Sequence, residues 1–195
     1  MKKLALTMAA AVGALGMSAA ANAQQRPPVL VVDTDRILNE CTACKAAATQ
    51  LQSQIQQARQ RAQQLEASLK PEAESLEKAV QALGSKQPDA ALQARIAAYR
   101  QKQQQGSTEL SSRESTLQST QAHVQQQIGA KIVQVAEQSR ARRQATVVMT
   151  KSGGVIAADN AADITGEVLA ALNQQLPAVS VTPMPQQAQS KPQGR

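Results

Sequence analysis

The longest regular pattern in the chain is a seven-residue repeat of apolar side chains between Leu51 and Leu83. Two positions of the repeat are apolar at nine of ten places, and the spacing between them alternates between four and three residues. This spacing is typical of a left-handed coiled-coil seam, flanked here by Gln, Arg, Lys, Glu and Ser. The seam comprises Leu51, Ile55, Ala58, Ala62, Leu65, Leu69, Glu72, Leu76, Ala79 and Leu83.

The segment 84–89, GSKQPD, interrupts the repeat with turn residues and predicts the tip of a helical hairpin. In the returning helix the apolar seam continues at Leu110, Leu117 and Val124, which are seven residues apart. The whole predicted arm covers residues 36–143, and ~50 residues in each helix would extend ~75 Å.

Two places in the arm conflict with a regular helix. Pro71 should kink the first helix, because proline costs roughly 3 kcal/mol in a helix interior. The apolar seam of the second helix is weakest at residues 103–106, where glutamines and a glycine predict local bending.

Short β-branched runs on both sides of the arm predict a small β body. Val29–Val32 follows two prolines and is typical of a buried strand. Residues 146–149 and 155–158 predict two further strands, joined by a tight turn at Gly153-Gly154. Because all three strands lie at the same end of the hairpin, we expect the first to pair with the strand starting at Thr146, or with its copy in another subunit.

Polar residues predict where the helices begin. Asp33 or Asp35 can cap the first helix, and Asn160 with Asp163 has the spacing of a capping box for a last helix. That helix would present Ile164, Val168, Leu169 and Leu172 on one face and end before Pro177. Residues 177–195 are rich in Pro, Gln and Ser without periodicity, so we expect a disordered tail.

These elements predict an α+β fold, with a long antiparallel helical hairpin (a coiled-coil arm) on a small β body of residues 24–35 and 144–176. The single aromatic residue, Tyr99, argues against a wide core. Three short strands and one short helix form a small body, which usually needs oligomerisation to be stable. The strand residues expected to take part are Val29, Leu30, Val31, Val32, Val147, Val148, Val155 and Ile156.

Residues 1–23 have the pattern of a signal peptide: two lysines, an apolar run, and the cleavage signature Ala21-Asn22-Ala23. We therefore expect export to the periplasm and cleavage after Ala23. Without Lys2 and Lys3, 19 basic and 14 acidic residues remain, a net charge of +5. This charge favours acidic polypeptides, nucleic acid or anionic lipid as partners, or simply solubility, and export argues against nucleic acid.

Little in the sequence predicts catalysis. His123 is the only histidine and lies in a polar stretch of the arm, where a solvated helix position is the simpler interpretation. The Gly153-Gly154 pair lacks the context of a phosphate-binding loop. We therefore expect no enzyme, no cofactor and no metal site.

Four features resemble the Skp/OmpH-like family of periplasmic chaperones: the signal peptide, VLVVDTDRILNE, the Gln-, Lys- and Glu-rich hairpin, and VIAADNAADITGEVLAAL. The resemblance covers about residues 29–176. It implies a homotrimer in which strands of three chains form a small barrel and the arms enclose a cavity. It also implies that unfolded outer-membrane proteins are held there without ATP. Anionic lipid or lipopolysaccharide is a further partner class that it implies, with no residues carried over.

Charge would assist such holding. Residues 51–143 contain 13 basic and 8 acidic side chains, a net charge of +5, and outer-membrane barrels tend to be acidic. The candidates for client-facing basic residues, each of which could equally be part of a solvated face, are Arg59, Arg61, Lys70, Lys78, Arg95, Arg100 and Lys102. The alternative function is a structural coiled-coil adaptor or spacer of the cell envelope, which would bind one folded partner.

Cys41 and Cys44 are the only cysteines. The family usually has serine and glycine at these positions, so no family role carries over. Thioredoxin-like chemistry would need further strands, a metal site would need more ligands, and haem attachment would need histidine where Lys45 stands. In an oxidising compartment we expect a local Cys41–Cys44 disulfide, with pairing between subunits or free thiols as alternatives.

Overall fold

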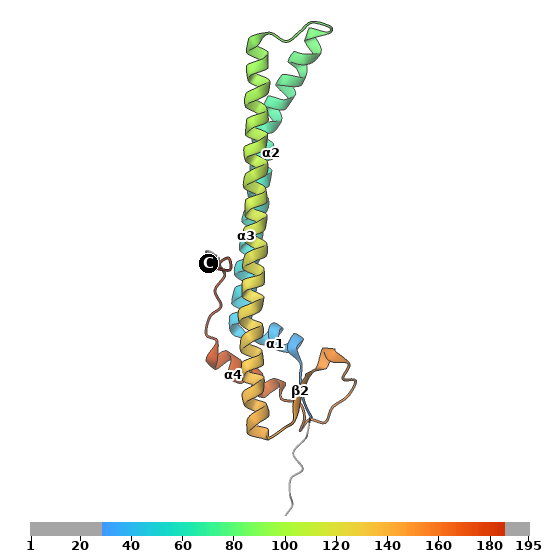
Figure 1. Cartoon of the computed structure of the whole chain (residues 1–195), viewed down its shortest axis with the longest axis vertical. Coiled ribbons are helices and arrows are strands. Elements are labelled where there is room, and N and C mark those ends of the chain that lie inside the picture. The colour runs from blue at the N-terminus through green and yellow to red at the C-terminus, as the bar shows by residue number, and fades with distance from the viewer. Residues whose placement is uncertain (1–28, 186–195) are drawn as a thin grey trace, which may run out of the picture.

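The computed structural model describes residues 29–185, and in it a long helical arm stands on a small body (Figure 1). The predicted signal peptide lies outside the described residues. The arm consists of α2 (Thr42–Leu83) and α3 (Ala90–Arg143). The body consists of β1 (Val29–Val32), α1 (Thr34–Glu40), β2 (Val147–Thr150), the 3₁₀ turn η1 (Lys151–Gly153) and α4 (Thr165–Gln175). No helix between residues 29 and 185 is long and apolar enough to cross a membrane.

The sheet confirms the predicted pairing of the first strand with the strand after the arm. β1 and β2 are parallel, with Val29 opposite Val147 and Val32 opposite Thr150. On its other side, β1 bonds to the segment before α4: Val31 N donates to Ala162 O at 2.8 Å, and Ile164 N donates to Val31 O at 2.9 Å. β1 is therefore the central element of the sheet, and β2 lies at its edge.

The prediction of a third strand at residues 155–158 is wrong. Only Gly154 of the glycine pair has a positive φ, +97°, and it follows η1 rather than forming a tight hairpin turn. The chain then runs as an irregular loop in which Ile156 is fully exposed. A short apolar run forms a strand only where its backbone groups find a partner strand, and β1 already has a neighbour on each side.

The first helix begins where the sequence predicted, but it does not continue into the arm. The Asp33 carboxylate caps α1 by accepting a hydrogen bond from Arg36 N at 2.9 Å. Cys41 then adopts extended backbone (φ −61°, ψ 127°), so α1 ends there and α2 begins at Thr42. The predicted continuous arm from residue 36 is corrected to one that starts at Thr42.

α2 passes through Pro71 as a single helix and ends at the predicted tip. Figure 1 shows the last turns of α2, before the tip, leaning away from α3. At the tip, Gly84 has φ +58°, which glycine adopts without strain. The Asp89 carboxylate accepts a hydrogen bond from Leu92 N at 2.7 Å and so caps α3.

α3 is one helix of 54 residues, including the stretch 103–106 that was expected to bend it. Figure 1 shows α3 running straight. Gly106 is buried, with the methyl groups of Leu65 in α2 as the nearest neighbours of a Cβ placed on it. The glycine therefore lies at the helix interface instead of breaking the helix.

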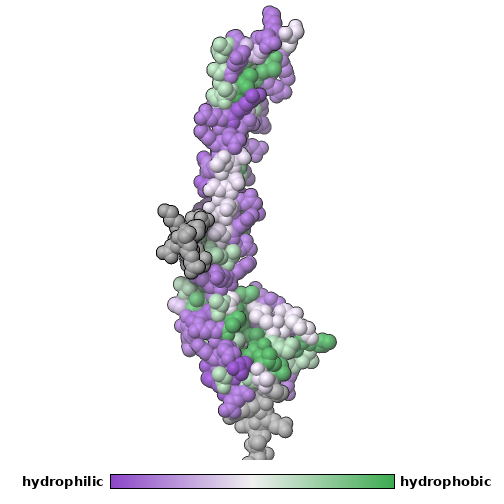
Figure 2. Space-filling view, in the orientation of Figure 1, coloured by the Kyte–Doolittle hydropathy of each residue, from purple (hydrophilic) through white to green (hydrophobic). Residues whose placement is uncertain are grey.

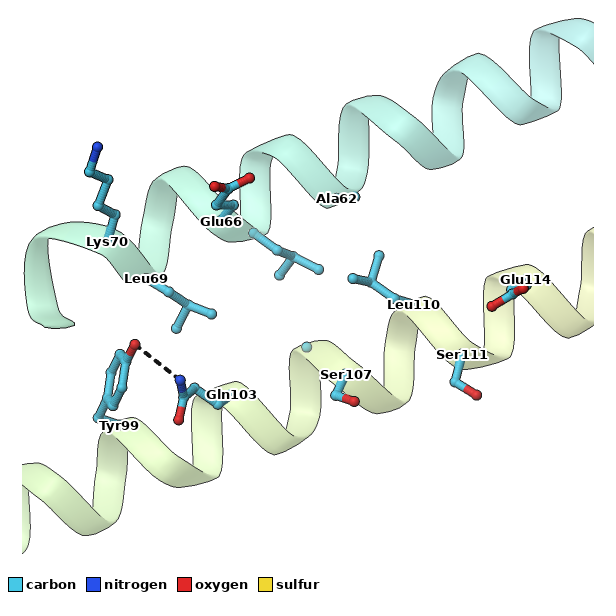
Figure 3. A pocket seen from close by; sticks show the side chains of 12 residues that line it. Ala62, Glu66, Leu69, Lys70, Tyr99, Gln103, Ser107, Leu110, Ser111 and Glu114 are labelled. Atoms are coloured by element: carbon cyan, nitrogen blue, oxygen red, sulfur yellow. Dashed lines mark hydrogen bonds between the residues drawn. The ribbon is translucent and has the colours of Figure 1, made fainter.

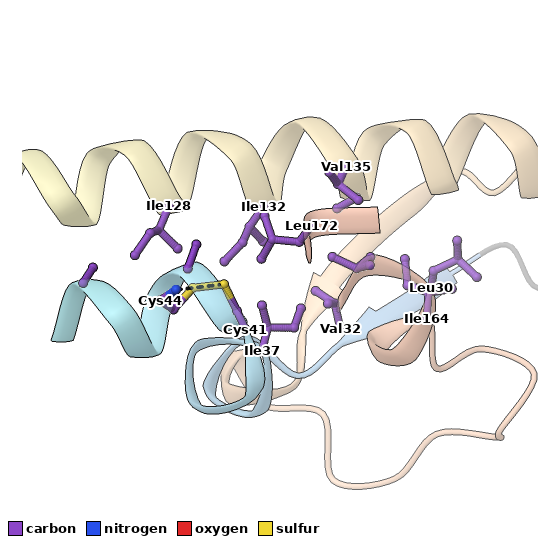
Figure 4. Packing of buried hydrophobic residues seen from close by; sticks show 14 of the residues in the cluster. Leu30, Val32, Ile37, Cys41, Cys44, Ile128, Ile132, Val135, Ile164 and Leu172 are labelled. Atoms are coloured by element: carbon purple, nitrogen blue, oxygen red, sulfur yellow. Dashed lines mark hydrogen bonds between the residues drawn. A yellow bond between two sulfur atoms is a disulfide. The ribbon is translucent and has the colours of Figure 1, made fainter. Parts of the chain in front are cut away.

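The core lies where the arm meets the body, and it is built from β1, α1, the roots of α2 and α3, and α4 (Figure 4). Its fully buried apolar side chains are Leu30, Ile37, Cys41, Val135, Ile164, Val168 and Leu172. Leu169 packs against this cluster and is partly buried. The apolar face predicted for the last helix therefore covers the root of the arm.

The capping box predicted for α4 is wrong. Ile164 occupies the N-cap position and makes no side-chain hydrogen bond. Asp163 Oδ1 instead accepts a hydrogen bond from Thr165 N at 2.8 Å, and Thr165 Oγ1 accepts one from Asp33 N at 2.9 Å. The hydrogen bonds from the Thr165 side chain and backbone lower the pKa of Asp163.

The tail also departs from expectation. Residues 177–185 lie against the arm, where Val179 and Val181 pack on the core cluster and several backbone groups are hydrogen bonded. The expected disorder is corrected for these residues, while residues 186–195 lie outside the described range.

Candidate functional site

A groove of about 760 Å³ lies between α2 and α3 in the middle of the arm (Figure 3). Its apolar lining includes Leu65 and Leu69 of α2 and Leu110 of α3. Figure 3 shows Leu69 and Leu110 pointing into the space between the helices, with Glu66 and Lys70 directed away from it. The groove therefore offers an apolar strip with a polar and charged rim.

The groove exists because the seam of α3 lacks large apolar residues here. Gly106 and Ser107 stand opposite the leucines of α2, and neither the glycine, which has no side chain, nor the small serine fills the space. Gln103 donates a hydrogen bond through Nε2 to the Tyr99 hydroxyl at 3.1 Å, and Figure 3 shows the Tyr99 ring extending from α3 toward Leu69 of α2. The weak seam predicted at residues 103–106 thus marks an opening in the arm.

One of the predicted client-facing cations, Arg61, connects the two arm helices. Its Nε and Nη2 donate to the two carboxylate oxygens of Glu109, both at 2.8 Å, and Arg113 Nε donates to Glu109 Oε1 at 2.9 Å. Hydrogen bonds from Arg61 and then Arg113 lower the pKa of Glu109 to about 2. A bidentate pair of this kind fixes the register of α2 against α3.

Two more of the predicted cations have partners across the arm. Lys102 Nζ lies 2.6 Å from Glu72 Oε2, and Arg95 Nη2 donates to Ser75 Oγ at 3.0 Å. The other four candidates are exposed and form no ion pair within residues 29–185: Arg59, Lys70, Lys78 and Arg100. These four candidates are therefore open to a partner.

The body carries an exposed apolar face beside β2. A groove of about 440 Å³ lies between β2 and α3, and its lining includes Val133, Val147 and Met149. These three side chains are 69%, 40% and 41% exposed. Figure 2 shows hydrophobic surface gathered on the body and again near the tip of the arm.

β2 pairs only with β1 within the described residues, so its outer edge has unpaired backbone groups. An unpaired edge beside exposed apolar side chains is typical of a surface that docks another protein.

The residues predicted for oligomerisation divide into two groups. Leu30, Val31 and Val32 are 4% exposed or less, because they pack inside the chain's own core. Val29 and Val147 are exposed and Val148 is half-buried, whereas Val155 and Ile156 lie in the loop. Val133 and Met149 were not predicted as part of this face. Val133 belongs to α3 and Met149 to β2, and nothing in the sequence shows that these two elements pack side by side.

Cys41 and Cys44 are bonded through their sulfur atoms at the root of the arm (Figure 4). Cys41 Sγ also accepts a hydrogen bond from Cys44 N at 3.2 Å, so the first cysteine caps α2. Both side chains are buried, and Figure 4 shows them facing the α3 side chains Ile128 and Ile132. The disulfide therefore braces the junction between α1 and α2 and offers no exposed sulfur.

A pair of arginines at the end of α3, which sequence reasoning also missed, holds α4 in place. Arg142 Nη2 and Arg143 Nε donate to the two carboxylate oxygens of Glu167 at 2.6 and 2.9 Å. The hydrogen bond from Arg142 is the main cause of a lowered pKa of Glu167.

The comparisons agree with this architecture. The sequence matches the family of outer membrane proteins called OmpH-like over residues 28–172. A crystal structure of an OmpH-like protein from Caulobacter crescentus, assigned as an outer membrane chaperone, has a TM-score of 0.67 and 21% sequence identity to this chain. The match covers 83% of this chain and 94% of that one, and it shows a shared fold. No curated protein matches the chain. The chain belongs to the OmpH-like family.

Proposed function

We propose that this protein is an ATP-independent holdase chaperone of the periplasm that binds unfolded outer-membrane proteins along its arms and prevents their aggregation. The observation that carries the proposal is the arm groove, with its half-buried leucines and charged rim, on a long hairpin that projects from the body. A shallow groove of this kind offers an unfolded chain many weak contacts and no pocket shaped for one ligand. Membership of the OmpH-like family supports the same function.

Charge adds long-range attraction to these contacts. The arm, residues 51–143, has a net charge of +5, and the four candidate cations without an ion pair are exposed along it. Attraction between surfaces of opposite charge raises the rate of encounter and weakens as salt is added. Acidic unfolded barrels should therefore be captured faster and more tightly at low ionic strength. The same cations would favour anionic lipid or lipopolysaccharide headgroups.

We infer that the apolar face beside β2 is covered by other copies of the chain. Val133, Val147 and Met149 would be buried there, and the edge of β2 would gain a hydrogen-bonded neighbour. A homotrimer, as the resemblance to the Skp/OmpH-like family implies, would place three arms around a common cavity. Light scattering coupled to size exclusion should therefore give three times the mass of the exported chain, and a monomer would contradict this assembly.

Binding of a fluorescently labelled unfolded barrel, diluted from urea, tests the function. We expect affinity without nucleotide for several unrelated barrels, and weaker affinity as salt rises. Lys70→Gln with Lys78→Gln should weaken binding and reduce its salt dependence. The control, Lys45→Gln with Lys151→Gln, removes the same charge near the body, together with the 3.7 Å ion pair of Lys151 with Asp33, and should bind like the wild type. Binding of no unfolded barrel, together with one folded partner, would favour the adaptor alternative instead.

A further inference from the structure

The strap, which we define as residues 177–185, follows α4 and lies along the root half of the arm. Figure 1 shows it rising from α4 beside the helices. It has no helix or strand of its own. The arm holds it in place mainly through side chains that bond to its backbone.

Two glutamines bind the strap backbone from the two arm helices. Gln127 of α3 donates from Nε2 to Ser180 O and accepts from Ser180 N through Oε1, both at 3.0 Å. Gln54 of α2 donates from Nε2 to Val181 O at 3.0 Å. The paired bonds at Ser180 are those that a neighbouring β-strand would make with the same residue.

Two other α3 side chains extend this row along the strap. Ser119 Oγ accepts a hydrogen bond from Met184 N at 3.1 Å, and His123 Nδ1 lies 3.0 Å from Thr182 O. On the same strap, Val179 and Val181 pack their side chains against the core cluster. A groove of about 500 Å³ continues from Val181 along α2 and α3.

These contacts depend on an extended backbone and on apolar side chains at alternate positions, and hardly on the identity of the polar residues. The strap meets that requirement with Val-Ser-Val-Thr at residues 179–182. The strands of outer-membrane barrels have the same alternation, because one face of each strand contacts lipid and the other faces the lumen. An extended client segment would therefore make the same backbone hydrogen bonds with these side chains as the strap does.

We propose that this row of side chains on α2 and α3 is a binding site for extended segments of unfolded barrel proteins, and that the strap occupies the site as an internal competitor. The proposal rests on the holdase function and specifies how that function recognises a client backbone. A tethered competitor reduces the fraction of empty sites, so it weakens the apparent affinity for client by the same factor. A client segment can then bind at this site only when the strap leaves it.

The first test releases the strap in the full chain by Val179→Gln with Val181→Gln, since packing polar amides against the apolar core cluster disfavours the seated position without changing the charge. Affinity for a labelled unfolded barrel should rise roughly three- to tenfold, as expected if a tenth to a third of the sites are empty in the wild type. Ala178→Gln places the same side chain at an exposed strap residue and is the control, with unchanged affinity expected. Equal affinity of the release variant and the wild type would overturn the proposal.

A second pair of variants tests the site itself. In the release background, Gln127→Ala should lower client affinity at least threefold. Gln126→Ala, at the neighbouring exposed position of α3, should leave it unchanged. Equal affinities in these two variants would overturn the proposed role of the glutamine.

Hydrogen exchange on the wild-type protein tests, without any substitution, whether a client displaces the strap. In the client-free protein the amides of Ser180 and Met184 should exchange roughly three- to tenfold more slowly than unprotected amides, and with saturating client they should exchange at the unprotected rate. Fast exchange without client, or the same rate with and without it, contradicts the proposal while leaving the holdase function intact. If no form of the protein binds an unfolded barrel, the holdase function fails instead.

Discussion

Replacing Gly106 by alanine should stabilise the arm. Gly106 lies in the interior of α3, with an ordinary helical conformation and a buried position against α2. A Cβ placed on it would lie 3.8 and 3.9 Å from the two methyl carbons of Leu65, which is normal van der Waals contact. The substitution therefore adds a methyl group without displacing a neighbour.

Two contributions determine the expected gain in the free energy of unfolding. Alanine is favoured over glycine in a helix interior by about 0.8–1.0 kcal/mol. Burying one methyl group contributes up to about 0.8 kcal/mol more, and less here because the adjoining groove is open. The free energy of unfolding should therefore rise by about 1–2 kcal/mol.

Gly129→Ala is the matched control in the same helix. Gly129 is exposed, and a Cβ there would meet no atom within 4 Å, so only the helix-propensity term applies. Its expected gain is about 1 kcal/mol. The difference between the two variants isolates the contact with Leu65.

Urea unfolding followed by circular dichroism at 222 nm measures both variants. All proteins must be compared at one protomer concentration, because assembly of copies shifts the apparent stability. A loss of stability in Gly106→Ala alone would mean that α2 and α3 approach each other more closely than described, and would refute the packing of the arm. Equal gains in both variants would show that the added methyl contacts nothing.

Three further predictions concern the arm and its root. Because the Arg61 and Arg113 hydrogen bonds lower the pKa of Glu109 to about 2, their contribution to stability should be complete above the ordinary glutamate pKa of 4.5 and be lost as the pH falls toward 2. Glu109→Gln should therefore flatten the acid limb of stability measured by urea unfolding against pH, and an unchanged limb would contradict this. Reducing the Cys41–Cys44 disulfide opens a loop with a sequence separation of 3, so it should cost about 2 kcal/mol in unfolding free energy while the protein stays folded. Thermal unfolding with and without reductant measures this cost, and Cys41→Ala with Cys44→Ala should show no response to reductant. Leu76→Ala should destabilise the distal arm by roughly 2 kcal/mol, since Leu76 is 6% exposed, whereas Val80→Ala, at a position 46% exposed, should cost much less in the same urea unfolding assay.

The arm could be predicted from the sequence because helical periodicity is a local signal. The repeat from Leu51 to Leu83, the break at residues 84–89 and the cap at Asp33 all depend on residues within a few turns of one another. The opening at residues 103–106 was also visible as a gap in the seam.

The features that could not be predicted depend on contacts between residues that are far apart in the sequence. Residues 155–158 have the composition of a strand, yet the place beside β1 is occupied by residues 162–164. The pairing of Arg61 with Glu109, 48 residues away, could not be predicted, because it requires the register of α2 against α3.

The strap was missed for a different reason. The alternation of Val179 and Val181 with polar residues was present, but it was outweighed by the surrounding Pro, Gln and Ser. A short alternating segment becomes ordered only when a complementary surface is available, and no local pattern reveals that surface.

Aggregation of an unfolded outer-membrane barrel tests the central claim most directly. The barrel is diluted from urea into buffer without nucleotide, and light scattering is followed with increasing amounts of the exported chain. We expect scattering to fall to the baseline once the assembled chaperone equals the barrel in concentration. Undiminished scattering at a severalfold excess of the protein would contradict the account.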